Sequence, residues 1–434
     1  MKILKQEIYF PIIIGIHFLF WIIDLYFYQG NFQEIHSDTL FFGELKNESW
    51  MNTHRILGEV FSSWVVTVFA FNFLMASRMK WVERLFGGLD KMYLIHRRSG
   101  VIAIVLLIAH FIFVPRDLTA FSPGKPMGFY AFFLILIGVI ISAVPFFKRK
   151  IPYHLWVNFH KLMGVFYILG VIHAGMVNSL IKELPITRIY VFGMAFIGVA
   201  AWFYRAFLFG VFNKKKKYTV EKVDDKSQGV VDIYLKPVKD GIKFSAGQFA
   251  FFTFPAISKR ESHPFTISSH PYEDLLRITV KDLGDYTNSL VTKLKEGDMA
   301  SVEGPYGHFS SSYIKEKDQV WIAGGIGITP FLSLINDIYT DQVHLIWSVK
   351  RKEEATHEDE LLKAVAKNPH INLQIWDSEN SGHIKVDDFN MGDHIQNKAY
   401  LICGPGSLKE SIMKQLLNEG VPRGSIYDEE FAFR

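Results

Sequence analysis

The chain has 434 residues, of which 49% are hydrophobic, and its formal net charge is only +4. So small a charge argues against nucleic-acid binding. The single cysteine, Cys403, excludes an intramolecular disulfide and any zinc or iron–sulfur site built from cysteines. Long apolar runs fill residues 1–212, whereas residues 213–434 have the composition of a soluble α/β protein, so we expect a membrane domain followed by soluble domains.

The apolar first half contains six segments that reach the roughly 20 mainly apolar residues needed to cross a bilayer. They lie near 8–28, 55–76, 92–114, 128–147, 154–177 and 187–210. Lysine and arginine gather in the connections near 77–91, 148–150 and 213–217, and the intervening connections carry few. The positive-inside rule therefore predicts six spans with both termini in the cytoplasm. The first segment continues without a cleavage site, so we expect an anchor and not a removed signal peptide.

Two of these segments carry histidine pairs at related spacings. His96 and His110 lie fourteen residues apart in the third segment, which is about 21 Å along a helix and nearly the same face. His160 and His173 lie in the fifth segment, which runs in the same direction. His96 can therefore face His160, and His110 can face His173. Two cross-helix pairs at two depths are what two stacked b-type haems require, because neutral imidazole nitrogens ligate haem iron axially.

The fifth segment needs a local irregularity for this arrangement. Thirteen steps from His160 to His173 leave the two side chains roughly 140° apart on an ideal helix, so we expect a twist or bulge near Gly164 or Gly170. Any single membrane histidine could instead be a hydrogen-bonded interior residue. That interpretation is preferred for the histidines that lack matching partners, which are His17, His54 and His154.

From Tyr218 onward, short β-like segments with glycine-containing turns predict a small antiparallel barrel over 213–315. Its segment HPFTISS (263–269) resembles the flavin-binding motif of membrane ferric reductases and NADPH oxidases, a branch of the ferredoxin–NADP reductase superfamily. The resemblance implies that the isoalloxazine and ribityl chain of FAD contact His263, Pro264, Phe265 and Thr266. It also implies that the turn LGDYT meets the FAD pyrophosphate through Gly284 and Thr287.

The segment QVWIAGGIGITPFLSLI (319–335) predicts a strand, a glycine-rich turn and a helix, within an α/β nucleotide-binding domain over 316–434. Glycines let backbone amides approach a pyrophosphate, and a helix N-terminus favours its negative charge. The form GGIGITP resembles the NAD(P)H-binding turn of the same superfamily. The residues that this turn would place at the nucleotide are Gly324, Gly325, Gly327, Thr329 and Pro330.

Two further elements bear on the nicotinamide nucleotide. Lys350 and Arg351 follow the expected second strand, where a 2′-phosphate can be held, which favours NADPH over NADH; they could equally form a solvated basic loop. Cys403, Gly404 and Pro405 resemble the family's C-G-P motif beside the nicotinamide. Cys403 could instead be a small buried residue without a role in the site.

Near the end of the chain, Phe433 matches the C-terminal aromatic that shields the flavin face in this family. The resemblance implies that Phe433 and Cys403 act where the hydride is transferred. Phe433 could instead be a terminal aromatic that belongs to the core.

The resemblance covers nearly the whole chain and implies a six-helix transmembrane haem-binding bundle, then an antiparallel β-barrel FAD domain and an α/β nucleotide-binding domain. Electrons would pass from cytoplasmic NADPH or NADH through FAD and two b-type haems to an extracytoplasmic acceptor, because flavin converts hydride transfer into single-electron steps. We expect an enzyme of the bacterial inner (plasma) membrane. No oligomeric state is indicated.

The acceptor is either a ferric chelate or oxygen. Animal oxidases that resemble this chain have a further histidine one turn past the outer ligand, where Val114 stands here. This difference favours a ferric reductase over a superoxide-producing NADPH oxidase. The same residues are also compatible with an electron-feeding partner of another membrane or periplasmic redox protein, and with a haem-free channel or transporter that carries an appended flavin reductase.

Overall fold

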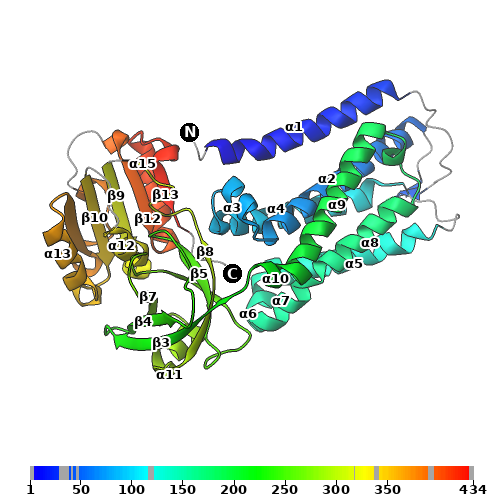
Figure 1. The fold of residues 1–434 in the computed structure, drawn as a ribbon. Coiled ribbons are helices and arrows are strands. Elements are labelled where there is room, and N and C mark those ends of the chain that lie inside the picture. Colours follow the sequence, from blue (N-terminus) through cyan, green and yellow to red (C-terminus); the bar gives the residue numbers. More distant parts are fainter. Residues whose placement is uncertain are drawn as a thin grey trace. The chain divides into compact units, whose positions relative to one another are not determined.

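The computed structural model describes residues 4–28, 39–40, 43–44, 48–115, 122–316, 318–336, 342–389 and 395–429, and it divides into two compact units (Figure 1). The first unit is formed by Gln6–Phe86 and Lys91–Phe212. The second is formed by Asn213–Arg434 together with short stretches of the first half. The expected division into three domains stays a prediction.

The membrane half is built from helices that follow the apolar runs. In chain order they are α1 (Leu4–Phe27), α2 (Glu48–Ala76), α3 (Lys80–Phe86), α4 (Leu89–Phe113), α5 (Gly124–Ala143), α6 (Pro145–Lys150), α7 (Tyr153–Lys161), α8 (Met163–Met176), α9 (Pro185–Phe203) and α10 (Phe209–Phe212). A hairpin of β1 (Thr39–Leu40) and β2 (Gly43–Glu44) precedes α2, and a short turn of π-helix joins α9 to α10. Within the bundle, α2 packs against α9, and α5 packs against α8.

Five segments of the described chain are long and apolar enough to cross a membrane. They are Thr53–Ala76, Leu89–Phe113, Gly124–Ala143, Leu155–Met176 and Pro185–Phe212. These segments correspond to the second to sixth predicted spans and indicate an integral membrane protein. The first predicted span falls on α1, whose described apolar part, Ile12–Phe27, is shorter than a span requires. The count of six spans therefore stays a prediction.

The irregularity expected in the fifth segment is a break at Leu162, which separates α7 from α8. The indole of Trp202 packs over Gly164 so closely that an added Cβ would overlap the ring. The Trp202 Nε1–H also donates to the carbonyl of Lys161, at 2.9 Å. Because a helix break leaves backbone groups without their usual partners, this bond stabilises the end of α7.

Two buried carboxylates hold the segment that precedes α9. The backbone amides of Leu180 and Ile181 donate to Glu59 on α2, at 2.8 and 2.9 Å. Asp24 on α1 accepts the amide of Thr187, in the first turn of α9, at 2.6 Å. A carboxylate next to free amides at a helix start is favoured by hydrogen bonding and by the helix dipole. These acidic residues therefore tie three helices together.

The second unit begins with a six-stranded antiparallel sheet in the order β6-β5-β8-β3-β4-β7, which we call the antiparallel lobe. Its elements are β3 (Lys216–Asp225), β4 (Val230–Pro237), β5 (Phe249–Thr253), β6 (His263–Thr266), β7 (Leu276–Lys281), α11 (Asp285–Lys293) and β8 (Met299–Tyr306). An isolated bridge between Ile267, just after β6, and Ile278 on β7 brings the two edge strands together. The sheet is therefore curled, and its buried apolar residues fill the interior.

A five-stranded parallel sheet in the order β11-β10-β9-β12-β13 follows, which we call the parallel lobe. Its main elements are β9 (Asp318–Gly324), α12 (Thr329–Leu334), β10 (Gln342–Val349), α13 (Glu358–Lys367), β11 (Ile371–Asp377), α14 (Ser378–Ser381), β12 (Ala399–Cys403), α15 (Gly406–Asn418) and β13 (Ile426–Asp428). Two apolar clusters cover its two faces. The chain moves outward from β9 to β11 and returns beside β9 as β12, which creates a topological switch point between β9 and β12.

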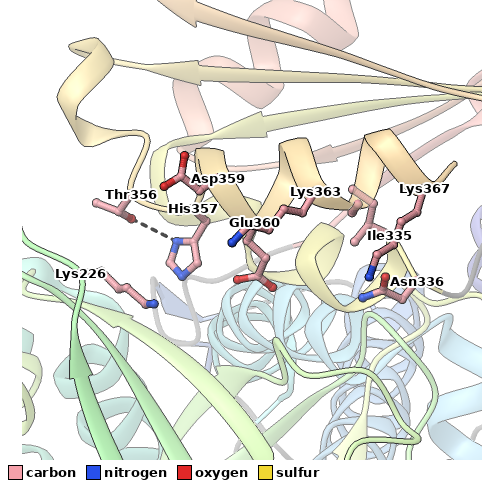
Figure 2. Close-up of a pocket in the computed structure, with 10 residues that line it drawn as sticks. Lys226, Ile335, Asn336, Thr356, His357, Asp359, Glu360, Lys363 and Lys367 are labelled. Carbon is pink, nitrogen blue, oxygen red and sulfur yellow. Dashed lines mark hydrogen bonds between the residues drawn. The ribbon is translucent and has the colours of Figure 1, made fainter. Parts of the chain in front are cut away.

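The two lobes are joined by a buried polar network that the sequence did not predict. Arg277 on β7 donates two hydrogen bonds to Glu360 on α13, at 2.8 and 2.7 Å. Asp232 on β4 is fully buried and lies 3.1 Å from Nε2 of His357, which precedes α13. His357 and Glu360 line a cavity of about 450 Å³ together with Lys226. Figure 2 shows these side chains.

Electrostatics explain why this network tolerates burial. Burial alone raises the pKa of the Asp232 carboxyl, but the hydrogen bond from His357 and the charge of Arg277 outweigh it and hold that pKa below its ordinary value. Asp232, His357 and Glu360 are close enough together to hold a metal ion. However, positive charge is already present there, because Arg277 and Lys226 each lie 3.6 Å from Asp232 and Arg277 also pairs with Glu360.

We expect Arg277→Met to destabilise the protein by about 3–5 kcal/mol, because the buried carboxylate of Asp232 loses one of its two nearby cations and keeps only Lys226, at 3.6 Å. The control is Lys236→Met, which removes an exposed ion pair on the same sheet and should cost less than about 1 kcal/mol. Thermal unfolding of the purified full chain, followed by tryptophan fluorescence, measures both. Because the pKa of Asp232 is lowered, the difference should be complete above about pH 4 and shrink at lower pH. Equal shifts in the two variants would contradict this account.

Candidate cofactor sites

One pair of histidines, which we call the inner pair because its expected place is nearer the cytoplasm, lies on α4 and α7. The ring centroids of His96 and His160 are 6.0 Å apart, with the ring planes at 77°. Nδ1 of His96 lies 3.2 Å from the carbonyl oxygen of Asn72, and Nδ1 of His160 lies 3.1 Å from Oγ of Ser142. With Nδ1 occupied by an oxygen partner, Nε2 carries the lone pair that a metal needs.

The outer pair lies on α4 and α8. The ring centroids of His110 and His173 are 6.5 Å apart. Their Nδ1 atoms contact the carbonyl oxygens of Gly58, at 2.8 Å, and Gly124, at 2.9 Å. An added Cβ on Gly128 would lie 2.6 Å from Nδ1 of His173, so the imidazole packs directly against the backbone of α5.

Both pairs fit axial ligation of one metal between two imidazoles. Metal–nitrogen bonds of about 2 Å on each side, together with the ring radii, require ring centroids about 6 Å apart. The observed separations of 6.0 and 6.5 Å meet this requirement. The donor set is also suitable, because haem iron accepts neutral imidazole at both axial positions.

The remaining membrane histidines are arranged differently. His17 is fully buried, and its Nε2 lies 2.8 Å from Oγ of Ser63, which confirms it as a hydrogen-bonded interior residue. The ring of His54 stacks on Phe113. The side chain of His154 lies outside the described residues.

The segment HPFT forms strand β6, which pairs with β5 so that Thr266 lies opposite Phe249. The ring of His263 stacks on Tyr286, with centroids 3.7 Å apart, and its Nε2 lies 3.1 Å from Glu261. The hydroxyl of Thr266 is buried and has no hydrogen-bond partner among the described residues. A buried polar atom of this kind is normally satisfied, so the strand suits a bound group with polar atoms, as flavin has.

The turn before α11 uses the hydroxyl of Thr287 as a helix cap. This oxygen accepts the amides of Leu283 and Gly284, at 2.9 and 3.0 Å, and donates to the carbonyl of Gly284. A hydroxyl has one donor and two acceptor positions, and these three bonds use all of them. Contact with a pyrophosphate would therefore fall to the backbone of the turn and to the first amides of α11, and not to this hydroxyl.

The glycine-rich turn lies at the switch point of the parallel lobe. Gly324 ends β9, Gly325 lies in a short 3₁₀ turn, and Thr329 and Pro330 open α12. An added Cβ on Gly327 would overlap the carbonyl oxygen of Cys403, at the end of β12.

The other glycines of these two turns are packed equally closely. A Cβ on Gly404 would lie 2.9 Å from Cα of Gly324, and one on Gly324 would lie 2.8 Å from Pro405. The turns after β9 and β12 therefore meet backbone to backbone. Ligands of open parallel sheets bind at this position, outside the carboxyl ends of the strands.

The remaining candidates lie in different environments. Cys403 is fully buried, and burial together with nearby Glu429 raises the pKa of its thiol well above the ordinary value, so the thiol is neutral. Lys350 and Arg351 are exposed after β10, and Arg351 lies 3.8 Å from Glu354. Phe433 lies outside the described residues, so its position relative to the flavin motif stays a prediction.

Comparison with known families accounts for most of this architecture. Residues 61–171 match the model of the ferric reductase like transmembrane component, residues 212–310 an FAD-binding domain, and residues 313–429 the C-terminal domain of adenylate-forming reductase 03009. The fold and these matches define a membrane-embedded flavoprotein. These matches, together with the NADPH oxidase relatives, support membership of the ferric reductase and NADPH oxidase family.

Individual relatives are distant. Dual oxidase 1 of Homo sapiens is 26% identical over 55% of this chain and 16% of its own length. NADPH oxidase 1 of Rattus norvegicus is 23% identical over 57% of this chain and 53% of its own length. This chain therefore spans only part of the relatives that it matches. A flavohemoglobin from Malassezia yamatoensis, with bound FAD and heme, shares the fold over 89% of this chain and 99% of its own, with a TM-score of 0.51 and 16% identity.

We expect Gly327→Ala to destabilise the parallel lobe by about 1–3 kcal/mol or more, because the new methyl group meets a backbone carbonyl that cannot rotate away. Gly406→Ala is the matched control, since nothing lies within 4 Å of its added Cβ. Thermal unfolding of the two full-length variants measures the difference. An equal midpoint for both variants would show that the turns after β9 and β12 separate without cost.

Proposed function

We propose that this protein is an NAD(P)H-dependent oxidoreductase that passes electrons from cytoplasmic NADPH or NADH through FAD and two b-type haems to an extracytoplasmic acceptor. The proposal rests on the two histidine pairs, His96 with His160 and His110 with His173. In each pair Nδ1 of both rings contacts an oxygen, and the ring separation suits one metal between them. The matches to the ferric reductase and NADPH oxidase family also support the proposal. The proposal includes six spans, with both termini in the cytoplasm, in a bacterial plasma membrane.

The cofactors would be held by distinct parts of the chain. The histidine pairs would hold the haems, and the backbone of β6 and of the turn at Gly284 would hold FAD. When bound, the flavin supplies the conversion of a two-electron hydride into single electrons, and the haems supply one-electron carriers across the bilayer. The nicotinamide nucleotide would bind where the turns after β9 and β12 meet, with Lys350 and Arg351 near its 2′-phosphate.

The residues at the proposed transfer points would have distinct roles. The buried, neutral thiol of Cys403 would pack near the nicotinamide without acting as a nucleophile, and Phe433 would cover the flavin. Because Nδ1 of each imidazole contacts an oxygen, Nε2 would be the nitrogen that ligates the iron. With both imidazoles of a pair holding the haem, neither would be left to bind the acceptor.

A ferric chelate is the acceptor that we favour, and oxygen is the second candidate. Arg55, the cation near the outer end of α2, has 11% of its side chain exposed and pairs with Glu59 at 3.2 Å, so it does not offer a free charge to superoxide. Similarity to proteins named NADPH oxidase favours oxygen. Anaerobic reduction of an Fe(III) chelate with little oxygen consumption would support the reductase. Superoxide-dismutase-sensitive cytochrome c reduction that matches NADPH loss would support the oxidase.

The reduced-minus-oxidised spectrum of the purified protein tests the proposal directly. We expect two haems per FAD, and we expect His110→Ala or His173→Ala to remove one haem and leave the other, because each pair ligates its own iron. His54→Ala is the control and should retain both haems, since its ring stacks on Phe113 outside the two pairs. A wild-type protein that contains flavin but gives no Soret band would refute the proposal and favour a haem-free transporter.

Gly128→Ala tests the outer pair without changing a histidine. The added methyl group would lie 2.6 Å from Nδ1 of His173, so the imidazole must turn away, and we expect the haem content to fall from two to about one. Gly175→Ala, two residues from His173 and with nothing within 4 Å of its added Cβ, should keep both haems. Loss of the same haem in both variants would show that any added methyl group on these helices disturbs haem binding, and that the contact with His173 is not the cause.

A further inference from the structure

His160 is held differently from the other three histidines. The Nδ1 atoms of His96, His110 and His173 each contact a backbone carbonyl oxygen. Nδ1 of His160 instead contacts a side-chain hydroxyl, Oγ of Ser142 on α5, at 3.1 Å. A carbonyl has a fixed role as acceptor, whereas a hydroxyl can donate or accept, so the partners of Ser142 decide the protonation of His160.

The hydroxyl of Ser142 has two further partners. Its oxygen lies 2.7 Å from the carbonyl oxygen of Gly138, one turn earlier on α5, and Nε1 of Trp156 donates to it at 3.2 Å. The indole of Trp156 also stacks on the ring of His160, with centroids 5.3 Å apart and an interplanar angle of 21°. Trp156 therefore touches His160 through its ring and reaches it again through Ser142.

The distances assign the protons. A separation of 2.7 Å is the usual length of an O–H···O bond, whereas 3.1 and 3.2 Å lie in the range of N–H···O bonds. Ser142 thus gives its single proton to Gly138 and accepts from both Trp156 and Nδ1 of His160. Nδ1 must then carry a proton, which leaves the lone pair on Nε2, the atom that a metal would use.

We propose that Ser142 and Trp156 are positioning residues that set the electron-donating strength of His160 at the inner haem, an inference that rests on the proposed function. Ser142 shares its acceptor oxygen between Nδ1–H of His160 and the indole N–H of Trp156, so Trp156 weakens the pull of this hydroxyl on Nδ1–H. A stronger acceptor at Nδ1 makes the imidazole a better donor to the metal. The inner haem is therefore tuned separately from the outer one.

Two substitutions should shift the inner haem in opposite directions. Ser142→Ala removes the acceptor, so the ferric form is less stabilised, and we expect a higher midpoint potential and roughly 10–100-fold weaker haem retention. Trp156→Phe keeps the stacked ring but removes the competing donor, so Ser142 binds Nδ1–H more strongly and the potential should fall. Ser142→Thr retains the hydroxyl and should behave like the wild type.

Redox titration of the full-length holoprotein, with low-temperature EPR of the ferric haems, measures these effects. The same variants in the His110→Ala background, which should lack the outer haem, identify the redox and EPR signals of the inner haem. In the background with both haems, the midpoint potential of the outer haem should not change. Opposite shifts in Ser142→Ala and Trp156→Phe support the inference. A wild-type protein with two haems, in which Ser142→Ala leaves the inner potential and EPR unchanged or both variants shift the same way, overturns it. Absence of haem from the wild type would instead refute the proposed function.

Discussion

Four imidazoles inside apolar helices impose the constraint around which the membrane half is built, because a polar atom in hydrocarbon must find its partner within the protein. Helix α2 supplies the acceptors for α4, and helix α5 supplies those for α7 and α8. On α2 the two acceptor carbonyls come from residues 58 and 72, and on α4 the two histidines are residues 96 and 110. Both separations are fourteen residues. A single alignment of the two helices therefore brings each histidine next to its carbonyl partner, at both depths in the membrane.

The sequence was informative about the membrane site where the signal is local. The spacing of His96 and His110 predicted a shared face, and that of His160 and His173 predicted an irregularity, which lies at Leu162. The partners of these histidines left no such signal, because a backbone carbonyl carries no residue identity and a serine in an apolar run is common. Glu59, an acid within an apolar run, was a signal that could have been interpreted as a buried cap.

In the soluble half, motifs predicted the position of each turn but not the distant pairs that join the lobes. Asp232 and His357 are 125 residues apart, and no periodicity relates them. The role of Thr287 shows a second limit, since a motif implies that a hydroxyl is important but not which group receives its bonds. The sequence also could not decide the exposure of Cys403, which depends on distant residues of the apolar cluster that covers its face of the sheet, such as Phe331.

The break at Leu162 explains how two unequal spacings form two matched pairs. A continuous fifth helix would place His160 and His173 on different faces, whereas the break turns α7 relative to α8 so that each reaches α4. Trp202 stabilises the break by bonding the carbonyl of Lys161 and packing over Gly164. Because the break lies between the two histidines, α7 carries the inner one with its own partners and α8 carries the outer one with others.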